Sequence, residues 1–430
     1  MRIHVLAAAA LLTAAFSLHA ATDDPFVVHE WGTFTTVQSA DGEQISWTPP
    51  ASVDLPAFVY RSQMSGTWSS KPIYHPKDQS ALVRMETPVI YFYSQRERSA
   101  DVRVLFRGGN LTEWYPQGTR VESQATPVTG AAPHTRQFLI EWNDVKILAR
   151  DTRDMTLAGL IRSKAGDGDH YYIARETDAN FLRVSSPLAR KRPEHERDLF
   201  YRGLGYFQAP LMVRLDADEQ QLSLNAREAE PIHGAFLVCV RQGMMRYQKI
   251  DLRIANAVAA IDPNTQPFGA LDDVRKLAMH DMARALVNQG LYEKEARAMV
   301  NTWQDQWFAE EGTRVLYLLP RAWTDRTLEL QVSPRPDSVV RVMVGRAELI
   351  TPSIERQLRD QILTFRSGDG KAMSQAVAKV RELRLGRFLD AAFAKITKGE
   401  RDQMQLNAAW VLASSASQPH VREDERSARN

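Results

Sequence analysis

Residues 26–37 read Phe-Val-Val-His-Glu-Trp-Gly-Thr-Phe-Thr-Thr-Val, and they carry the clearest structural signal of the chain. Aromatic and β-branched residues dominate this stretch, which favours a β-strand. An extended backbone places Glu30 on the same face as Val28 and Phe34, with His29 and Trp31 on the opposite face. The stretch therefore predicts a strand that carries a carboxylate among apolar neighbours.

Similar short runs follow as far as residue 252, separated by turn residues such as Gly108-Gly109-Asn110 and Gly243. They are PVIYFYS (88–94), DVRVLF (101–106), FLIEW (138–142), HYYIARE (170–176), PLMVRL (210–215), GAFLVCV (234–240) and MMRYQKIDL (244–252). Many short strands without intervening helical patterns are typical of an antiparallel sandwich or barrel.

The pattern changes after residue 260. Apolar residues recur at helical spacing from Leu271 to Leu286, and again from Ala296 to Trp307 before Gly312. Three further strand-like runs follow at 313–319, 328–333 and 339–345, and they could rejoin the first sheet. Helices are then expected at 353–365, 371–396 and 401–412.

We therefore expect an α+β fold: an antiparallel β-rich, sandwich-like N-terminal body, a helical hairpin, further strands and C-terminal helices. The predicted division is a signal peptide at 1–20, a β-rich domain at 21–260 and a second part at 261–413. That second part is expected to pack on the same body. A polar tail at 414–430 is expected to be disordered.

The first twenty residues have the order of a secretory signal. Arg2 is followed by an apolar run from Val5 to Phe16 and then by small residues at Ala20 and Ala21. The run is too short to span a bilayer, which needs about 20 apolar residues. We expect cleavage and a periplasmic or secreted protein without a transmembrane anchor. An uncleaved amphipathic anchor is the alternative.

Composition excludes some classes of protein. The chain has 54 Lys and Arg against 52 Asp and Glu, so charge gives no case for nucleic acid as a partner. The one cysteine, Cys239, cannot form an internal disulfide, and its apolar surroundings predict a buried structural thiol. No nucleophile elbow, phosphate loop, zinc-protease motif or dinucleotide-binding glycine pattern occurs.

Several charged residues stand in strand-like, aromatic surroundings. Arg84 and Glu86 precede an apolar run, and Glu113 stands beside Trp114 and Tyr115. A carboxylate in such surroundings needs a charged partner or a raised pKa. The pattern leaves two readings open: an acid–base site, or structural ion pairs with arginines.

Residues 170–178 predict a strand face that carries His170, Tyr172, Glu176 and Asp178. An imidazole, a phenol and two carboxylates together could perform acid–base chemistry or hold a divalent metal. A solvated strand face is the alternative.

These observations define the candidate site residues. The catalytic candidates are Glu86, Glu113, Glu176 and His170. The substrate-binding candidates are Trp31, Trp114, Tyr115, Tyr172, Arg84 and Arg175. The weaker metal alternative uses His29 and Glu30. We expect Glu30, Glu86 and Glu176, with His29 and His170, to form one shared polar cluster.

Glu310 and Glu311 are a further anomaly, because they stand at the predicted end of a helix. The helix dipole disfavours negative charge there by roughly 0.3–1 kcal/mol per group. A locally unfavourable choice indicates a role in the tertiary structure, either in a salt bridge or in a site.

Several segments carry a resemblance. They are HEWGTFT (29–35), RMETPVIYFYS (84–94), TEWYP (112–116), ARETD (174–178), LFYRGLG (199–205) and TWQDQWFAEEGTRVLYLLP (302–320). Together they resemble a group of exported bacterial proteins of unknown function whose mature chains begin with HEWGTFT. The resemblance covers about residues 26–350 and implies no mechanism.

The functional expectation is a hydrolase of an envelope or environmental polymer, with a glycan ahead of a peptide. One carboxylate would act as the acid and another as base or nucleophile. The alternative is a non-catalytic envelope module that binds a glycan or a protein. Carboxylates that converge in an open pocket would favour the enzyme. Carboxylates paired with Arg84, Arg175 or Arg202 in the core would favour the module.

Overall fold

The computed structural model describes residues 24–48, 55–62, 80–125, 136–150, 169–227, 231–232, 234–250 and 258–417. The predicted signal peptide and the last thirteen residues of the predicted tail lie outside this part of the chain. The described residues form a mixed α+β fold with 31% helix and 39% strand, which confirms the expected fold class.

The described strands and helices have the following bounds. The strands are β1 (Val27–Ser39), β2 (Gln44–Ile45), β3 (Tyr60–Arg61), β4 (Val83–Tyr93), β5 (Arg98–Arg107), β6 (Gly109–Tyr115), β7 (Arg120–Ala125), β8 (Arg136–Ile147), β9 (Leu182–Val184), β10 (Glu194–Glu196), β11 (Leu199–Gly205), β12 (Leu211–Leu215), β13 (Leu222–Ala226), β14 (Ala235–Arg241), β15 (Met244–Ile250), β16 (Val258–Ile261), β17 (Gly269–Ala270), β18 (Gly312–Leu318), β19 (Leu328–Ser333) and β20 (Ser338–Ile350). The helices are α2 (Asp169–Ile173), α3 (Leu271–Asn288), α4 (Glu293–Phe308), α5 (Arg321–Thr327), α6 (Pro352–Arg366), α7 (Gly370–Glu382), the 3-10 turn η3 (Gly386–Phe388), α8 (Leu389–Thr397) and α9 (Gln403–Ser417).

Within the described residues, one large sheet runs through the molecule in the order β17, β15, β14, β18, β20, β1, β4, β11, β6, β3, with β2 paired to β1. Its neighbouring strands are antiparallel except β1 and β20, which run parallel along their whole length. Strands from both sides of residue 260 therefore share one sheet, and β18 and β20 lie at its centre.

Two smaller sheets accompany it. One has the order β10, β9, β8, β5, β19 with β7 paired to β8, and the other is β12, β13, β16. A single hydrophobic cluster combines side chains of all three sheets, including Val28 and Phe34 of β1. The opposite face of β1 carries Trp31 into a second cluster with α2, α3 and α4. The face alternation predicted for residues 26–34 is confirmed.

The register of β1 against β4 shifts between Trp31 and Thr33. Gly32 lies at this irregularity, where a Cβ atom would stand 2.9 Å from the Cα atom of Pro88. Only glycine lets the two backbones approach so closely, because any side chain would meet backbone atoms there.

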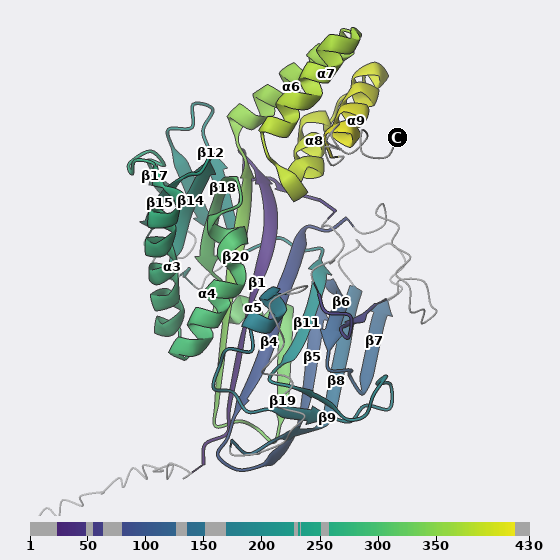
Figure 1. Cartoon of the computed structure of the whole chain (residues 1–430), viewed down its shortest axis with the longest axis vertical. Coiled ribbons are helices and arrows are strands. Elements are labelled where there is room, and N and C mark those ends of the chain that lie inside the picture. The colour runs from purple at the N-terminus through teal and green to yellow at the C-terminus, as the bar shows by residue number, and fades with distance from the viewer. Residues whose placement is uncertain are drawn as a thin grey trace, which may run out of the picture.

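The C-terminal helices α6, α7, α8 and α9 form a separate layer at one end of the molecule, while α3 and α4 cover the large sheet (Figure 1). This helical layer has its own hydrophobic cluster, which includes Val37 of β1 together with Ile45 and Trp47. Among the described residues, no helix is long and apolar enough to cross a bilayer.

The expected strand at 170–176 is wrong, because residues 169–173 form the short helix α2. The helical turn directs both Tyr171 and Ala174, three positions apart, into the core. An extended chain would place these two residues on opposite faces.

The expected single helix over 371–396 is also wrong, since α7 ends at Glu382 and α8 begins only at Leu389. Arg384 between them has a φ of 49°, which ends the helix. The turn buries Leu385 and Phe388. At the C-terminus, α9 continues to Ser417, past the expected start of the tail at residue 414.

Candidate functional site

Glu30, like Glu113, is a predicted carboxylate with no exposed surface. Its neighbour on the parallel strand β20 is Arg341, whose Nε donates to the Glu30 carboxylate. The hydroxyl of Tyr201 donates to the same carboxylate. Arg341 also donates to Asp325 at 2.6 Å and to the carbonyl of Leu328 at 2.6 Å. Glu30 is therefore one half of a fully enclosed ion pair.

Glu113 of β6 is buried beside Arg84 of β4, with 3.4 Å between the Arg84 Nη2 and the carboxylate. Arg84 also donates to the Thr112 hydroxyl at 3.2 Å, and Thr112 donates to Glu113. Arg202 faces Glu113 across the β6–β11 strand pair. Two predicted site residues, Arg84 and Glu113, thus meet, but as an internal ion pair.

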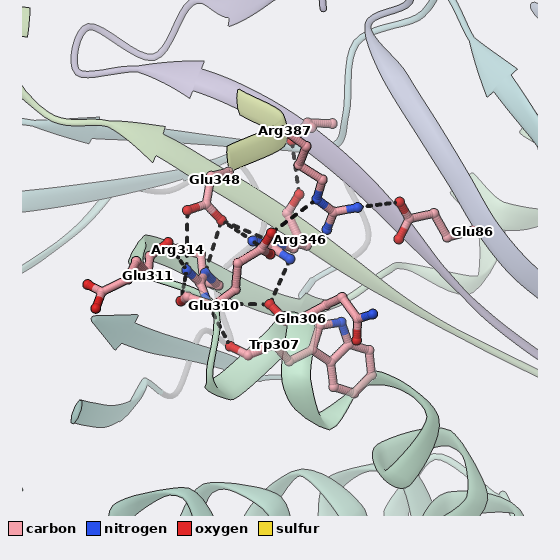
Figure 2. A network of polar contacts seen from close by, with 10 residues as sticks. Glu86, Gln306, Trp307, Glu310, Glu311, Arg314, Arg346, Glu348 and Arg387 are labelled. Carbon is pink, nitrogen blue, oxygen red and sulfur yellow. Dashed lines mark hydrogen bonds and ion pairs between the residues drawn. The ribbon is translucent and has the colours of Figure 1, made fainter. Parts of the chain in front are cut away.

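Glu86 of β4 lies 2.8 Å from the Nη1 of Arg387, which belongs to the helical layer. Arg387 also approaches Glu310, with 3.5 Å between its Nε and that carboxylate. Glu86 therefore lies at one edge of a charged network between the body and the helical layer (Figure 2).

The centre of this network is buried. Arg346 and Arg314 lie on β20 and β18 and share Glu348, with Nη2 of Arg346 at 2.6 Å and Nε of Arg314 at 3.0 Å from its carboxylate. Glu310 contacts Arg346 at 2.7 Å. Burial alone would raise the pKa of Glu310, but the surrounding arginines Arg346, Arg387 and Arg314 lower it to about 2.

The same arginines also satisfy the end of α4. Arg314 donates to the backbone carbonyls of Trp307, Glu310 and Glu311 at 3.2, 2.6 and 2.9 Å, and Arg346 donates to that of Gln306 at 2.7 Å. The last carbonyls of a helix have no partner within the helix. Here the buried guanidinium groups donate hydrogen bonds to carbonyls at the end of α4 and just after it. Glu310 supplies part of the negative charge that balances these guanidinium groups. The anomaly at Glu310 in the sequence therefore has a tertiary cause.

Tyr115, Tyr172 and Arg175 come together in an aromatic cluster with Phe58 and Tyr171. Ring centroids lie 4.6 Å apart between Phe58 and Tyr115 and 5.4 Å apart between Phe58 and Tyr171. The Arg175 guanidinium lies 4.8 Å from the centroid of Tyr172. Of the predicted residues in this region, Glu176 is exposed and His170 is half-buried on α2.

The partner of Arg175 was not foreseen. It is Glu196, which has no exposed surface. Its carboxylate accepts hydrogen bonds from Nε and Nη2 of Arg175 at 2.8 and 2.6 Å. The Tyr171 hydroxyl donates to it at 2.9 Å. Asp198 is buried nearby, and burial raises its pKa well above the usual range, with Glu196 adding to the effect.

A third carboxylate belongs to this segment. Glu194 accepts the Tyr60 hydroxyl and the Gln117 backbone N–H, both at 2.7 Å. Burial raises the pKa of Glu194. The signal for all three carboxylates was present in the alternation of acidic residues Glu194, Glu196 and Asp198, which puts them on one face of an extended chain.

His29 and Glu30 do not form a metal site, because they project to opposite faces of β1. His29 Nδ1 lies 2.7 Å from Glu295, which also accepts the Tyr93 hydroxyl at 2.6 Å and the Tyr292 backbone N–H at 2.8 Å. Within the described ranges, no group of three or more His, Cys, Asp or Glu residues could hold a metal ion.

The two tryptophans predicted to bind substrate are core residues. Trp31 is fully buried and packs against Tyr91, with 6.0 Å between ring centroids. Trp114 is 1% exposed and its indole N–H donates to Gln117. Neither ring is available for stacking against a ligand.

The expected shared cluster is not observed. Glu30 binds Arg341, Glu86 binds Arg387, and Glu176 is exposed beyond α2. No hydrogen bond or ion pair between described residues joins these three carboxylates. Alternation in a single strand shows which face a side chain occupies, but it does not show which strand lies beside that face.

An open groove of about 440 Å³ lies between the β14–β15 hairpin with the start of β18 and the helices α6 and α7. Its lining is mixed, with amide, hydroxyl, charged and small apolar patches. The residues are Val240, Arg241, Gln242, Glu311, Gly312, Thr313, Ser353, Ile354, Gln357, Gln361, Lys379, Glu382 and Leu383. None of the lining residues is among the predicted site residues, and only Glu311 stands out in the sequence, by its place at a helix end.

Comparisons with known proteins add little to this geometry. No protein family matches the chain, and no curated protein matches it. Among solved structures, the mu-homology domain of yeast delta-COP-I is similar at 7% identity, covering 76% of this chain and 97% of that domain with a TM-score of 0.26. A likeness at that TM-score carries no argument about function.

Proposed function

We propose that this chain is an exported, non-catalytic module of the bacterial envelope that binds a glycan in the groove between the body and the helical layer. One observation carries the proposal. Three of the buried carboxylates that could have served an enzyme, Glu30, Glu86 and Glu113, are each paired with an arginine: Glu30 and Glu113 inside the core, and Glu86 with Arg387 of the helical layer. Such pairs are costly to break and stabilise one arrangement of the chain.

The chemistry of the groove supports a polyhydroxylated ligand. Gln357 and Gln361 stand one turn apart on α6, and Gln242 and Thr313 line the same groove from the body. Amides and hydroxyls both donate and accept hydrogen bonds, as sugar hydroxyls do. Leu383 contributes an apolar patch for the C–H face of a ring. A peptide is the second ligand class that this lining fits.

Isothermal titration with short N-acetylglucosamine oligosaccharides tests the proposal, with alanine peptides of similar length in parallel. The double variant Gln357→Ala/Gln361→Ala should weaken glycan binding by about tenfold or more, because each lost hydrogen bond contributes about 1 kcal/mol. Gln331→Ala, at an exposed position on β19, is the matched control and should bind normally. Equal melting temperatures would show that all variants fold.

Two results would count against the proposal. If the double variant still binds the oligosaccharide, the glycan binds outside the groove. If the wild-type protein binds no oligosaccharide, a glycan is not the ligand. If the wild-type protein binds only the peptide and the double variant does not, the groove is the binding site but its ligand is a peptide.

A hydrolase is the second candidate, and the carboxylates at 196–198 favour it. Asp198, whose pKa is raised by burial, would act as the acid, and Glu196, which is paired with Arg175 at 2.6 Å, would be the second carboxylate. Half-buried Tyr115 and Tyr172 adjoin this region and could contact a sugar ring. Release of reducing ends from peptidoglycan or chitin, lost in Asp198→Asn with the fold retained, would establish this function. No release by the wild-type protein would exclude it for those substrates.

A further inference from the structure

The last helix of the layer, α9, is unusual in its lack of charge. None of its fifteen residues, Gln403–Ser417, is Asp, Glu, Lys or Arg. A surface helix normally carries charged residues on its outer face. The outer face of α9 instead presents Met404 and Trp410, which are 66% and 67% exposed, and Val411, which is 38% exposed.

These exposed residues belong to one side of a packed helix. Ala409, Leu412 and Ala413 are buried against the rest of the helical layer. Asn407 and Ser414, which are uncharged, are exposed between Met404, Trp410 and Val411. On the neighbouring helix α6, Leu363 is 57% exposed. The helical layer forms one end of the molecule (Figure 1), and the exposure of these residues leaves their face open to a flat partner.

The charge of the layer differs from that of the rest of the chain. Residues 352–417 contain eleven Lys and Arg against seven Asp and Glu, whereas the whole chain has a formal charge of only +2. Basic residues also adjoin α9 itself. Arg401 precedes its first turn, Arg366 contacts Asp402 at 2.7 Å, and Arg381 donates to the Ser415 carbonyl at 2.7 Å.

We infer that the outer face of α9 docks on an anionic lipid surface, with Trp410, Met404 and Val411 inserted at the level of the headgroups. Tryptophan is favoured at this depth because its ring is amphipathic. Apolar side chains on an interfacial helix bind membranes more strongly when nearby basic residues attract anionic lipids. A second copy of the chain is a poorer partner, because two layers with a net positive charge would repel each other.

Vesicle sedimentation tests this inference with the full chain. Vesicles that contain phosphatidylglycerol should retain the wild-type protein, and vesicles of phosphatidylcholine alone should retain much less. The variant Met404→Ser/Trp410→Ser should bind the anionic vesicles at least about tenfold more weakly, because it loses two inserted apolar side chains. Added salt should also weaken wild-type binding.

Leu277→Ser is the matched control, since Leu277 is 55% exposed on α3, outside the helical layer. It should bind vesicles as the wild type does, and all three proteins should melt at similar temperatures. Because every protein has the same N-terminal segment, a difference between them reports on α9.

Equal binding by the double variant would overturn the inference, as would no preference for anionic lipid. Concentration-dependent dimers that only the double variant loses would identify a second copy as the occupant instead. The groove variant Gln357→Ala/Gln361→Ala should still bind vesicles, so a failure of the glycan proposal is distinguishable from a failure of this one.

Discussion

Removal of the Glu310 charge is a sharp test of the charged network between the body and the helical layer. The Glu310 carboxylate is 29% exposed and lies 2.7 Å from Arg346 and 3.5 Å from Arg387. Its pKa falls from 4.5 to about 2 in the folded protein. Each unit of such a shift corresponds to about 1.4 kcal/mol, so the folded environment favours the ionised form by about 3 kcal/mol.

The sign of the pH dependence follows from the direction of this shift. Below about pH 4.5 the unfolded chain binds a proton at Glu310 that the folded protein excludes. The stability that Glu310 contributes is therefore complete above pH 4.5 and is lost as the pH falls towards 2. Glu310→Gln has no charge at any pH, so it should lose about 2–3 kcal/mol at pH 7.

Urea unfolding followed by tryptophan fluorescence measures both effects. Wild-type stability should fall between pH 5 and pH 3 more steeply than that of Glu310→Gln, because the variant has no proton to bind at this position. Glu293→Gln at the start of α4, the helix that ends just before Glu310, is the matched control, since Glu293 is 79% exposed and pairs only at the surface. It should stay within about 0.5 kcal/mol of the wild type. A Glu310→Gln protein as stable as this control, or with an unchanged acid slope, would refute the reasoning.

Three further predictions concern the core and the N-terminus. Glu30→Gln should destabilise the protein by about 3–5 kcal/mol in urea, because it leaves Arg341 buried without its main charge partner. The double change Glu30→Leu/Arg341→Met should recover much of that loss, and a loss as large as in the single variant would contradict the ion-pair account. Thiol reductant should not change the melting temperature, because Cys239 is a buried free thiol. Among the described residues, its sulfur accepts a hydrogen bond only from the Thr313 hydroxyl, at 3.3 Å. A drop of several degrees would reveal a crosslink between chains. Intact mass of protein recovered from the periplasm or medium of its native host should show a new N-terminus at Ala21 or Thr22, and a chain that still begins at residue 1 would exclude cleavage.

The sequence determined the local elements wherever the pattern was long and regular. The alternation around Glu30 predicted a strand with two different faces, and the helical spacing at 271–286 and 296–307 predicted α3 and α4. These signals are local, because a side chain's position along a helix or strand decides which face it occupies. The same alternation occurs at Glu194, Glu196 and Asp198, which places these carboxylates on one face.

Only the tertiary structure decides which arginine each buried carboxylate pairs with. Glu30 and Arg341 are separated by 311 positions, and Glu86 meets Arg387 across 301 positions. A carboxylate among apolar residues shows that compensation is needed, but several arginines could supply it, and strand order selects one. The helix at 169–173 is likewise decided by tertiary packing, because burial of Tyr171 and Ala174 against neighbouring rings outweighs a local pattern that resembles a strand.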